Sequence, residues 1–138
     1  MLTEMDITLQ TNNDSQRLEL RGVRRTGQDY SCLLVVESRG FGAARSFYFD
    51  EHHLEAFLKG LDVMESALEG GAILRHSFEE DRISFEVSRD GHVTVSGLLV
   101  EHSGCTQRLE FCIQTDQTVL KPLLQGFRRL KSGSEGGA

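Results

Sequence analysis

The 138-residue chain has no tryptophan, one proline and three cysteines, and no apolar stretch long enough to cross a membrane as a helix. A membrane-spanning helix needs about 18 or more consecutive apolar residues, so we expect no membrane segment. The first six residues are acidic and lack the basic and apolar regions of a signal peptide. The cysteines show no CxxC spacing and form a poor disulfide framework. These absences predict a cytoplasmic protein.

Basic side chains are in the minority. The chain carries 21 acidic and 15 basic residues, a net charge of −6. Proteins that bind nucleic acid usually present a basic surface, so we expect no nucleic-acid partner. Residues 50–81 hold nine acids and two bases, and the segments on either side are close to neutral. One segment therefore supplies the whole acidic excess.

Two helices are expected. The first covers about residues 50–69, with Asp50 as N-cap, Gly70-Gly71 as the stop, and apolar residues at spacings of three and four. The second covers about residues 118–131, where Pro122 must lie in the first turn because a proline interrupts a helix interior.

Most other segments alternate in the manner of strands. We expect one α+β domain over residues 1–131, with about six or seven strands of mainly antiparallel sheet, either open or folded into a sandwich. Residues 132–138 are small and polar, which predicts a disordered tail. The expected strands are Arg17–Val23, Tyr30–Glu37, Arg45–Phe49, Ala72–Phe78, Arg82–Arg89, His92–Val100 and Gln107–Thr115.

The hairpin around Asp90-Gly91 allows a prediction of register. A three-residue loop with a left-handed Gly91 places Val87 opposite Val93 and keeps apolar residues on one face. A two-residue loop would place Val87 opposite Thr94 and mix the faces. We therefore predict the three-residue loop.

No residues form a recognisable catalytic, cofactor or metal site. His52 and His53 are adjacent on the expected helix and point about 100° apart, so they do not converge on one metal ion. His102 and Cys105 could pair, but nothing orients them for nucleophilic catalysis. Cys32 and Cys112 lie in apolar runs and are expected to be buried, whereas Cys105 lies in a loop and is expected to be exposed.

The first helix should carry an acidic face. At about 100° per residue, its acids fall within about 40° of one direction and surround one leucine. This face is either solvated surface or a docking site for a basic partner, with the leucine as an apolar anchor. Its residues are Glu51, Glu55, Leu58, Asp62, Glu65 and Glu69.

The order of elements carries a resemblance to a known family. A strand ending in Phe47-Tyr48-Phe49-Asp50 opens the first helix, the hairpin Asp90–Val95 and the strand Leu109-Glu110-Phe111 follow, and a helix closes the chain from Gln117. Over roughly residues 16–131 this pattern resembles the WapI-type immunity proteins of bacteria and related small uncharacterised bacterial domains. The resemblance implies a non-enzymatic cytoplasmic protein that binds and blocks a toxin.

Two other classes of function stay open. One is a small-ligand or catalytic domain with a pocket between sheet and helix, using His102, Cys105 or His52. The other is a homo-oligomer, such as a homodimer, formed through an exposed sheet face or edge.

Overall fold

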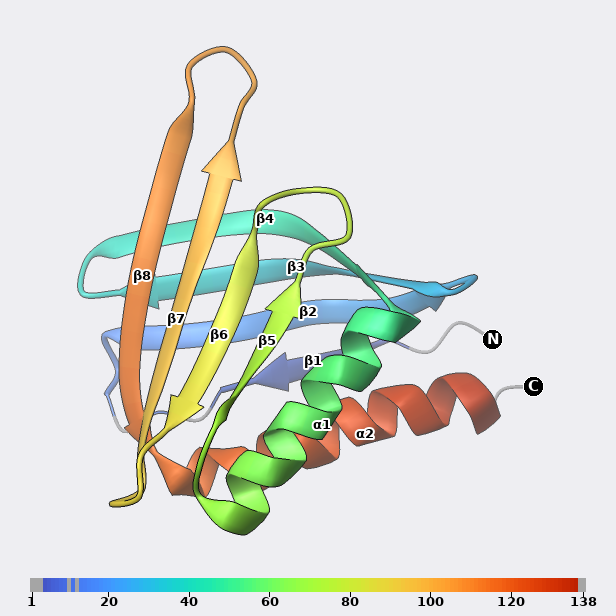
Figure 1. The fold of residues 1–138 in the computed structure, drawn as a ribbon. Helices are drawn as coiled ribbons and strands as arrows, with labels where there is room; N and C mark the ends of the chain where they lie inside the picture. The colour runs from blue at the N-terminus through green and yellow to red at the C-terminus, as the bar shows by residue number, and fades with distance from the viewer. Residues whose placement is uncertain (1–3, 10, 12, 137–138) are drawn as a thin grey trace.

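The computed structural model describes residues 4–9, 11 and 13–136. Within these, the chain runs twice through the same order, four antiparallel strands followed by a helix (Figure 1). The elements are β1 (Met5–Thr8), β2 (Gln16–Thr26), β3 (Asp29–Ser38), β4 (Phe41–Asp50), α1 (Glu51–Ala67), β5 (Gly71–Arg75), β6 (Arg82–Val87), β7 (His92–Glu101), β8 (Gln107–Asp116), the 3-10 helix η1 (Gln117–Val119) and α2 (Leu120–Gly136).

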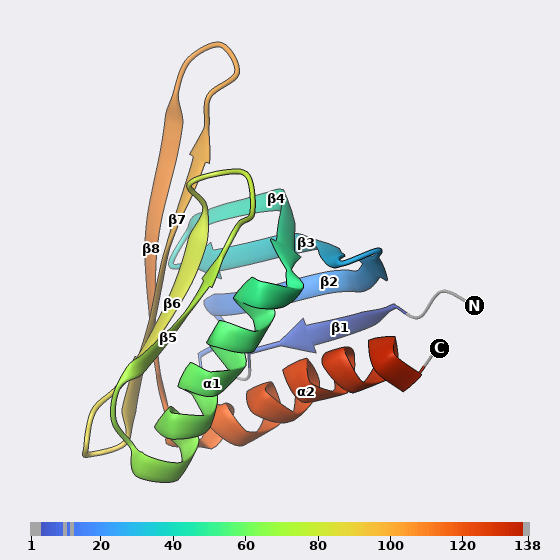
Figure 2. The same cartoon turned by 45° about the vertical axis from the view of Figure 1, so that its right-hand side comes forward.

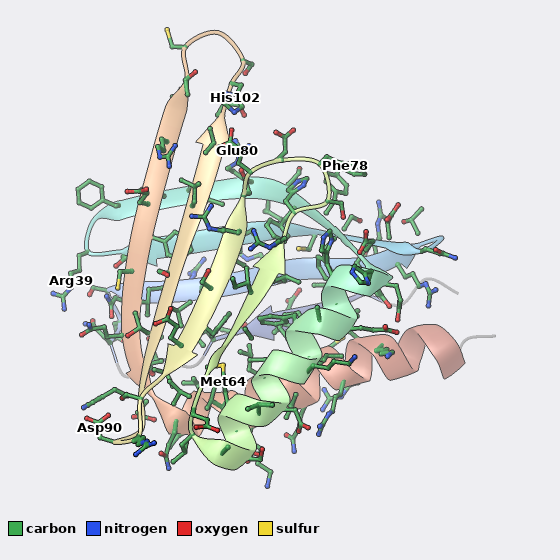
Figure 3. All side chains as sticks on the ribbon, in the orientation of Figure 1. Arg39, Met64, Phe78, Glu80, Asp90 and His102 are labelled. Atoms are coloured by element: carbon green, nitrogen blue, oxygen red, sulfur yellow. The ribbon has the colours of Figure 1, made fainter. Side chains whose placement is uncertain are left out.

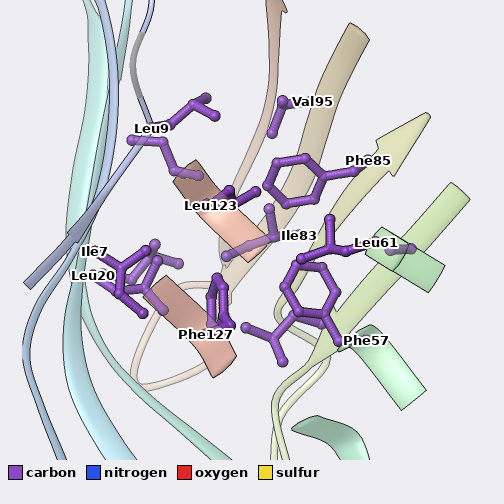
Figure 4. Packing of buried hydrophobic residues seen from close by; sticks show 14 of the residues in the cluster. Ile7, Leu9, Leu20, Phe57, Leu61, Ile83, Phe85, Val95, Leu123 and Phe127 are labelled. Atoms are coloured by element: carbon purple, nitrogen blue, oxygen red, sulfur yellow. The ribbon is translucent and has the colours of Figure 1, made fainter. Parts of the chain in front are cut away.

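Two sheets of four strands and two helices enclose the core. In each sheet the strands lie in sequence order, β1 to β4 in the first sheet and β5 to β8 in the second. The strands of the two sheets cross steeply, and α1 and α2 lie side by side where the sheets open (Figures 1 and 2). The ring of Phe57 in α1 lies 5.5 Å from that of Phe85 in β6 and 4.9 Å from that of Phe127 in α2, between ring centroids (Figure 4). Helices and second sheet thus share one core.

The expected number of strands was wrong. Over the described residues the chain forms eight strands in two sheets, where the sequence predicted six or seven strands, and the missed strand is β1. β1 has four residues, of which Ile7 is the buried one, so it is too short to show a periodic pattern. Strand β5 also ends at Arg75, earlier than the predicted Phe78.

Helix α1 confirms the predicted mid-chain helix and its cap. Asp50 has extended backbone, and its carboxylate accepts a hydrogen bond from the N–H of His53 at 2.8 Å. The helix ends at Ala67, because Leu68 adopts a left-handed conformation at φ 51° and its N–H bonds to the carbonyl of Met64. The stop therefore precedes the glycine pair.

The C-terminal helix is also present. Pro122 lies in the first turn of α2, as expected, and α2 extends to Gly136 rather than ending near residue 131. The predicted disordered tail over residues 132–138 stays a prediction, and its last two residues lie outside the described part of the chain.

The register of the β6–β7 hairpin confirms the three-residue loop. Val87 pairs with Val93, and Phe85 pairs with Val95. Gly91 has φ 87°, and the N–H of Ser88 bonds to the carbonyl of His92 at 2.9 Å. The left-handed glycine sets which residues face the core, since a slip of one residue would reverse both faces.

The cysteines divide differently from the prediction at one position. Cys32 is buried, and burial raises the pKa of its thiol to about 12. Cys105 is exposed, as expected. Cys112 is exposed rather than buried, because it alternates with the inward-facing Phe111 and Ile113 on β8.

Helix α1 lies unusually close to β5 at Gly60. A Cβ atom at this position would lie 2.7 Å from the Cβ of Ala72 and 2.7 Å from the carbonyl oxygen of Gly71. In α2, by contrast, a Cβ at Gly126 would meet only the side chain of Ile7, at 3.7 Å. Gly60 therefore has much less space around it than Gly126.

A buried carboxylate links the two sheets. The side chain of Asp81 is fully buried and lies 3.0 Å from Nε of Arg45, on β4. Its other oxygen accepts the N–H of Val100, on β7, at 3.0 Å. The guanidinium of Arg45 also donates to Glu101 at 2.7 Å and to the carbonyl of Val100 at 2.8 Å. Hydrogen bonds to Glu101 and Asp81 raise the pKa of Arg45, so its guanidinium stays protonated.

We predict opposite outcomes for alanine at Gly60 and at Gly126. Gly60→Ala should lower the free energy of unfolding by about 1–3 kcal/mol, because the backbone of β5 must move to admit the methyl group. Gly126→Ala should leave stability unchanged or raise it by up to about 1 kcal/mol, through helix propensity. Urea denaturation of both variants tests this, and equal changes would contradict the close packing of α1 on β5.

Removal of the buried carboxylate should destabilise the fold through the cation it leaves behind. Asp81→Ala is expected to lower the free energy of unfolding by about 3 kcal/mol. The double variant Asp81→Ala, Arg45→Met should recover part of this loss, since no unpaired charge then remains. A double-mutant cycle in urea measures the coupling, and strictly additive changes would contradict the link.

Candidate partner-binding surface

Helix α1 turns its apolar side inward and its acidic side toward α2. Its buried residues are Leu54, Phe57, Leu61 and Met64. The residues predicted to bind a partner lie beside this buried stripe, so they share one side of the helix. That side faces the neighbouring helix as well as solvent. It carries Glu51, Glu55, Leu58, Asp62 and Glu65, whereas the predicted Glu69 lies just beyond the end of the helix at Ala67.

Two acids of this face are paired with bases of α2. The carboxylate of Glu55 lies 3.2 Å from Nζ of Lys131. The carboxylate of Asp62 lies 2.8 Å from a guanidinium nitrogen of Arg128. Both pairs are solvent-exposed, so each contributes at most about 1 kcal/mol to stability. Their main effect is to neutralise the middle of the acidic face.

Glu51, at the start of α1, is held by β2 and β3. Its carboxylate accepts a hydrogen bond from the hydroxyl of Tyr30 at 2.7 Å and lies 4.0 Å from the guanidinium of Arg25. Negative charge is favourable at this end of a helix. Glu51 therefore interacts with strands of the first sheet, whereas Glu55 and Asp62 interact with α2.

The C-terminal end of α1 keeps its full charge, from Glu65 in the last turn and from Glu69, which lies just beyond the last helical residue, Ala67. Glu65 and Glu69 are exposed, and neither forms an ion pair with another described residue. Carboxylates are disfavoured at a helix C-terminus, so helix stability does not account for them. Leu58, the predicted apolar anchor, is half-buried and packs against the core. The uncompensated acid therefore lies at the C-terminal end of the face.

A second surface was not found from the sequence. It consists of Tyr48 on β4 and residues 76–80 of the β5–β6 loop, and we call it the β5–β6 corner. The ring of His76 lies 5.7 Å from that of Tyr48 and 6.0 Å from that of Phe78, between centroids, and the rings of Tyr48 and Phe78 lie 6.2 Å apart. Figure 3 shows Phe78 and Glu80 at the same end of the molecule. The corner was missed because residues 72–78 read as one continuous strand.

Hydrogen bonds of His76 shape this loop. Nδ1 of His76 accepts the N–H of Phe78 at 3.0 Å and that of Glu79 at 3.2 Å. Burial lowers the pKa of the imidazole, which keeps Nδ1 available as an acceptor. The N–H of Ser77 also bonds to the carbonyl of Tyr48 at 2.8 Å. The loop is therefore fastened both to itself and to β4.

The β7–β8 hairpin borders the corner. Glu80 lies 2.9 Å from Nε2 of His102, which is thereby paired with a carboxylate rather than with Cys105 (Figure 3). Hydrogen bonds from Ser103 and Arg45 lower the pKa of Glu101 to about 2, so this carboxylate is ionised. The thiol of Cys105 is exposed in the hairpin loop.

The alternative function requires a pocket between sheet and helix. Phe57, Phe85 and Phe127 fill the region between sheet and helices. A cavity of about 490 Å³ lies along the β3–β4 hairpin beside Phe41, and one of about 500 Å³ lies between Arg39 and the C-terminal half of β8.

A metal site also lacks a basis among the described residues. Within that part of the chain, no group of three or more histidine, cysteine, aspartate or glutamate side chains could hold a metal ion. The rings of His52 and His53 lie 6.1 Å apart, and Nδ1 of His53 lies 3.1 Å from the capping carboxylate of Asp50. Over the residues described, no helix has the length and apolar character needed to span a membrane.

Known proteins resemble this chain in fold and in family. No curated protein matches the chain. Among solved structures, the Trypanosoma bruciei MRP1/MRP2 crystal structures contain a similar chain, with a TM-score of 0.52 and 12% identity over 98% of this chain and 89% of that one. This similarity concerns the fold alone.

A family model supplies the relationship that similarity of fold does not. The model of the immunity protein WapI-like family matches residues 7–130, which span both sheets, α1 and most of α2. The match extends over nearly the whole chain, as the order of strands and helices led us to expect. The chain therefore belongs to the WapI-like immunity protein family.

Proposed function

We propose that this protein neutralises a toxin by binding it, and that acidic side chains on α1 supply part of the recognition. Family membership supports a toxin-neutralising role in general. The observation that carries the finer proposal is the uncompensated charge of Glu65 and Glu69. Such a surface suits a basic partner, because opposite charges accelerate association and disfavour wrong partners.

Inhibition by binding requires no chemistry from the immunity protein itself. A bound protein that covers the working surface of a toxin blocks it without a cofactor or a catalytic residue. We place this event in the cytoplasm, in keeping with three free cysteines among the described residues.

The six predicted residues should contribute unequally. Glu55 and Asp62 already hold bases of α2, so a partner would have to compete for them. Leu58 contributes through packing of the helix. Glu65 and Glu69 are free to meet a partner's bases, and we propose that they dominate the contribution of this face.

Charge reversal at the end of α1 should weaken binding while leaving the fold intact. Glu65→Lys, Glu69→Lys is expected to slow association with the cognate toxin domain about tenfold and to flatten its salt dependence. Stability should rise slightly, because lysine suits a helix C-terminus. Stopped-flow association at several salt concentrations measures both effects.

The matched control changes the net charge equally but elsewhere. Asp14→Lys, Glu37→Lys reverses two exposed acids of the first sheet, one in the loop between β1 and β2 and one on β3. It should slow association much less than the α1 variant. Equal slowing by both variants would mean that net charge, rather than the α1 face, governs recognition.

A further inference from the structure

We propose that the β5–β6 corner binds an arginine side chain of the toxin, with the rings of Tyr48 and Phe78 as its platform and Glu79 and Glu80 as its counter-charges. This inference rests on the proposed function, since it names a second contact for the same partner. It concerns a different part of the molecule from α1, so each surface can be tested separately.

Exposure of the two rings is the first observation. Phe78 is 72% exposed and Tyr48 is 40% exposed, and their rings lie 6.2 Å apart with a tilt of 53°. Single exposed apolar residues are common, but adjacent aromatic rings are typical of the centres of protein interfaces. Their open faces are able to receive a cation.

The loop is already ordered in the shape that presents Phe78. The N–H of Phe78 and that of Glu79 both bond to His76, and the N–H of His76 bonds to the carbonyl of Asp81 at 3.0 Å. Asp81 is in turn fixed by Arg45. A loop held at both ends loses little conformational entropy on binding, which favours affinity.

The charges beside the rings select a cation. From His76 to Asp81 the loop carries three carboxylates and no lysine or arginine. Of these, Asp81 forms an ion pair with Arg45, and Glu80 forms one with His102. Glu79 forms no ion pair with a described residue. The corner thus offers aromatic faces next to carboxylates that lack a guanidinium or ammonium partner.

Arginine fits this combination better than lysine. Its planar guanidinium stacks on an aromatic face and donates to carboxylates from its edge at the same time. A lysine ammonium is a compact point charge that gains less from stacking. The expected occupant is therefore an arginine on a protruding segment of the toxin.

The chain provides a matched control in Phe41. This residue is 70% exposed, close to the exposure of Phe78, but its neighbours in the β3–β4 hairpin are Arg39, Gly40 and Gly42. Phe41→Ser and Phe78→Ser thus remove equally exposed rings, one beside a base and one beside two acids. Both should fold, which the melting temperature checks.

The first arm of the test uses a defined probe. A synthetic peptide of three arginines separated by glycines is titrated into ¹⁵N-labelled protein and followed by NMR. Shift changes should centre on residues 76–81, and Phe78→Ser or Glu79→Gln, Glu80→Gln should raise the peptide Kd about fivefold. Phe41→Ser should leave the Kd unchanged, and a lysine peptide should bind more weakly. Shifts centred elsewhere, or no effect of Phe78→Ser, would overturn the site.

The second arm uses the cognate toxin domain, expressed together with each variant. The wild-type chain and Phe41→Ser should protect growth, and Phe78→Ser should protect at least tenfold less. Protection by Phe78→Ser equal to that of wild type would overturn this contact and leave the immunity role standing. Failure of the wild type to protect would instead contradict the proposed function, while the peptide arm still decides whether the corner binds arginine.

Discussion

The arrangement of this protein depends on one buried carboxylate. Asp81 ends the β5–β6 loop. Its carboxylate forms a salt bridge with Arg45 of the first sheet and accepts a hydrogen bond from the N–H of Val100 in the second sheet. A buried charge is costly unless it is paired and hydrogen-bonded, so the carboxylate of Asp81 must keep its contacts with both Arg45 and Val100. Because the loop is anchored at its end, the preceding residues hold a fixed shape at the surface. The same interaction that joins the sheets thereby positions the aromatic corner.

The acidic character of the chain acquires a different meaning once the helices are in place. In the sequence, five acids on one helix face look like a uniform negative surface. In the structure, bases of α2 pair with Glu55 and Asp62, and Tyr30 and Arg25 lie against Glu51. The like-charge repulsion within α1 is thus partly offset by the neighbouring elements. Free negative charge is left at the end of α1 and in the β5–β6 loop, and these are the surfaces that we assign to a partner.

Local patterns predicted much of the fold, and contacts between distant segments account for what they missed. Asp50, Pro122 and the left-handed Gly91 act through their own neighbours, so the helix cap, the first turn of α2 and the β6–β7 register followed from sequence. The division into two sheets depends on how strands pack, which alternation does not encode. The burial of Asp81 was missed for the same reason, since its partner Arg45 lies 36 residues away. The acidic face was predicted as a set of residues, but its pairing with α2 required the positions of both helices.

The central claim is that the protein recognises a toxin through negative charge at two places, the C-terminal end of α1 and the β5–β6 corner. The most direct measurement is an NMR footprint of the toxin domain on the ¹⁵N-labelled chain, from the backbone amides whose signals shift or broaden on complex formation. The account predicts that the affected amides cluster in residues 65–69 and 76–81. A footprint confined to the β3–β4 hairpin and the C-terminal half of β8, with both acidic segments unaffected, would contradict it.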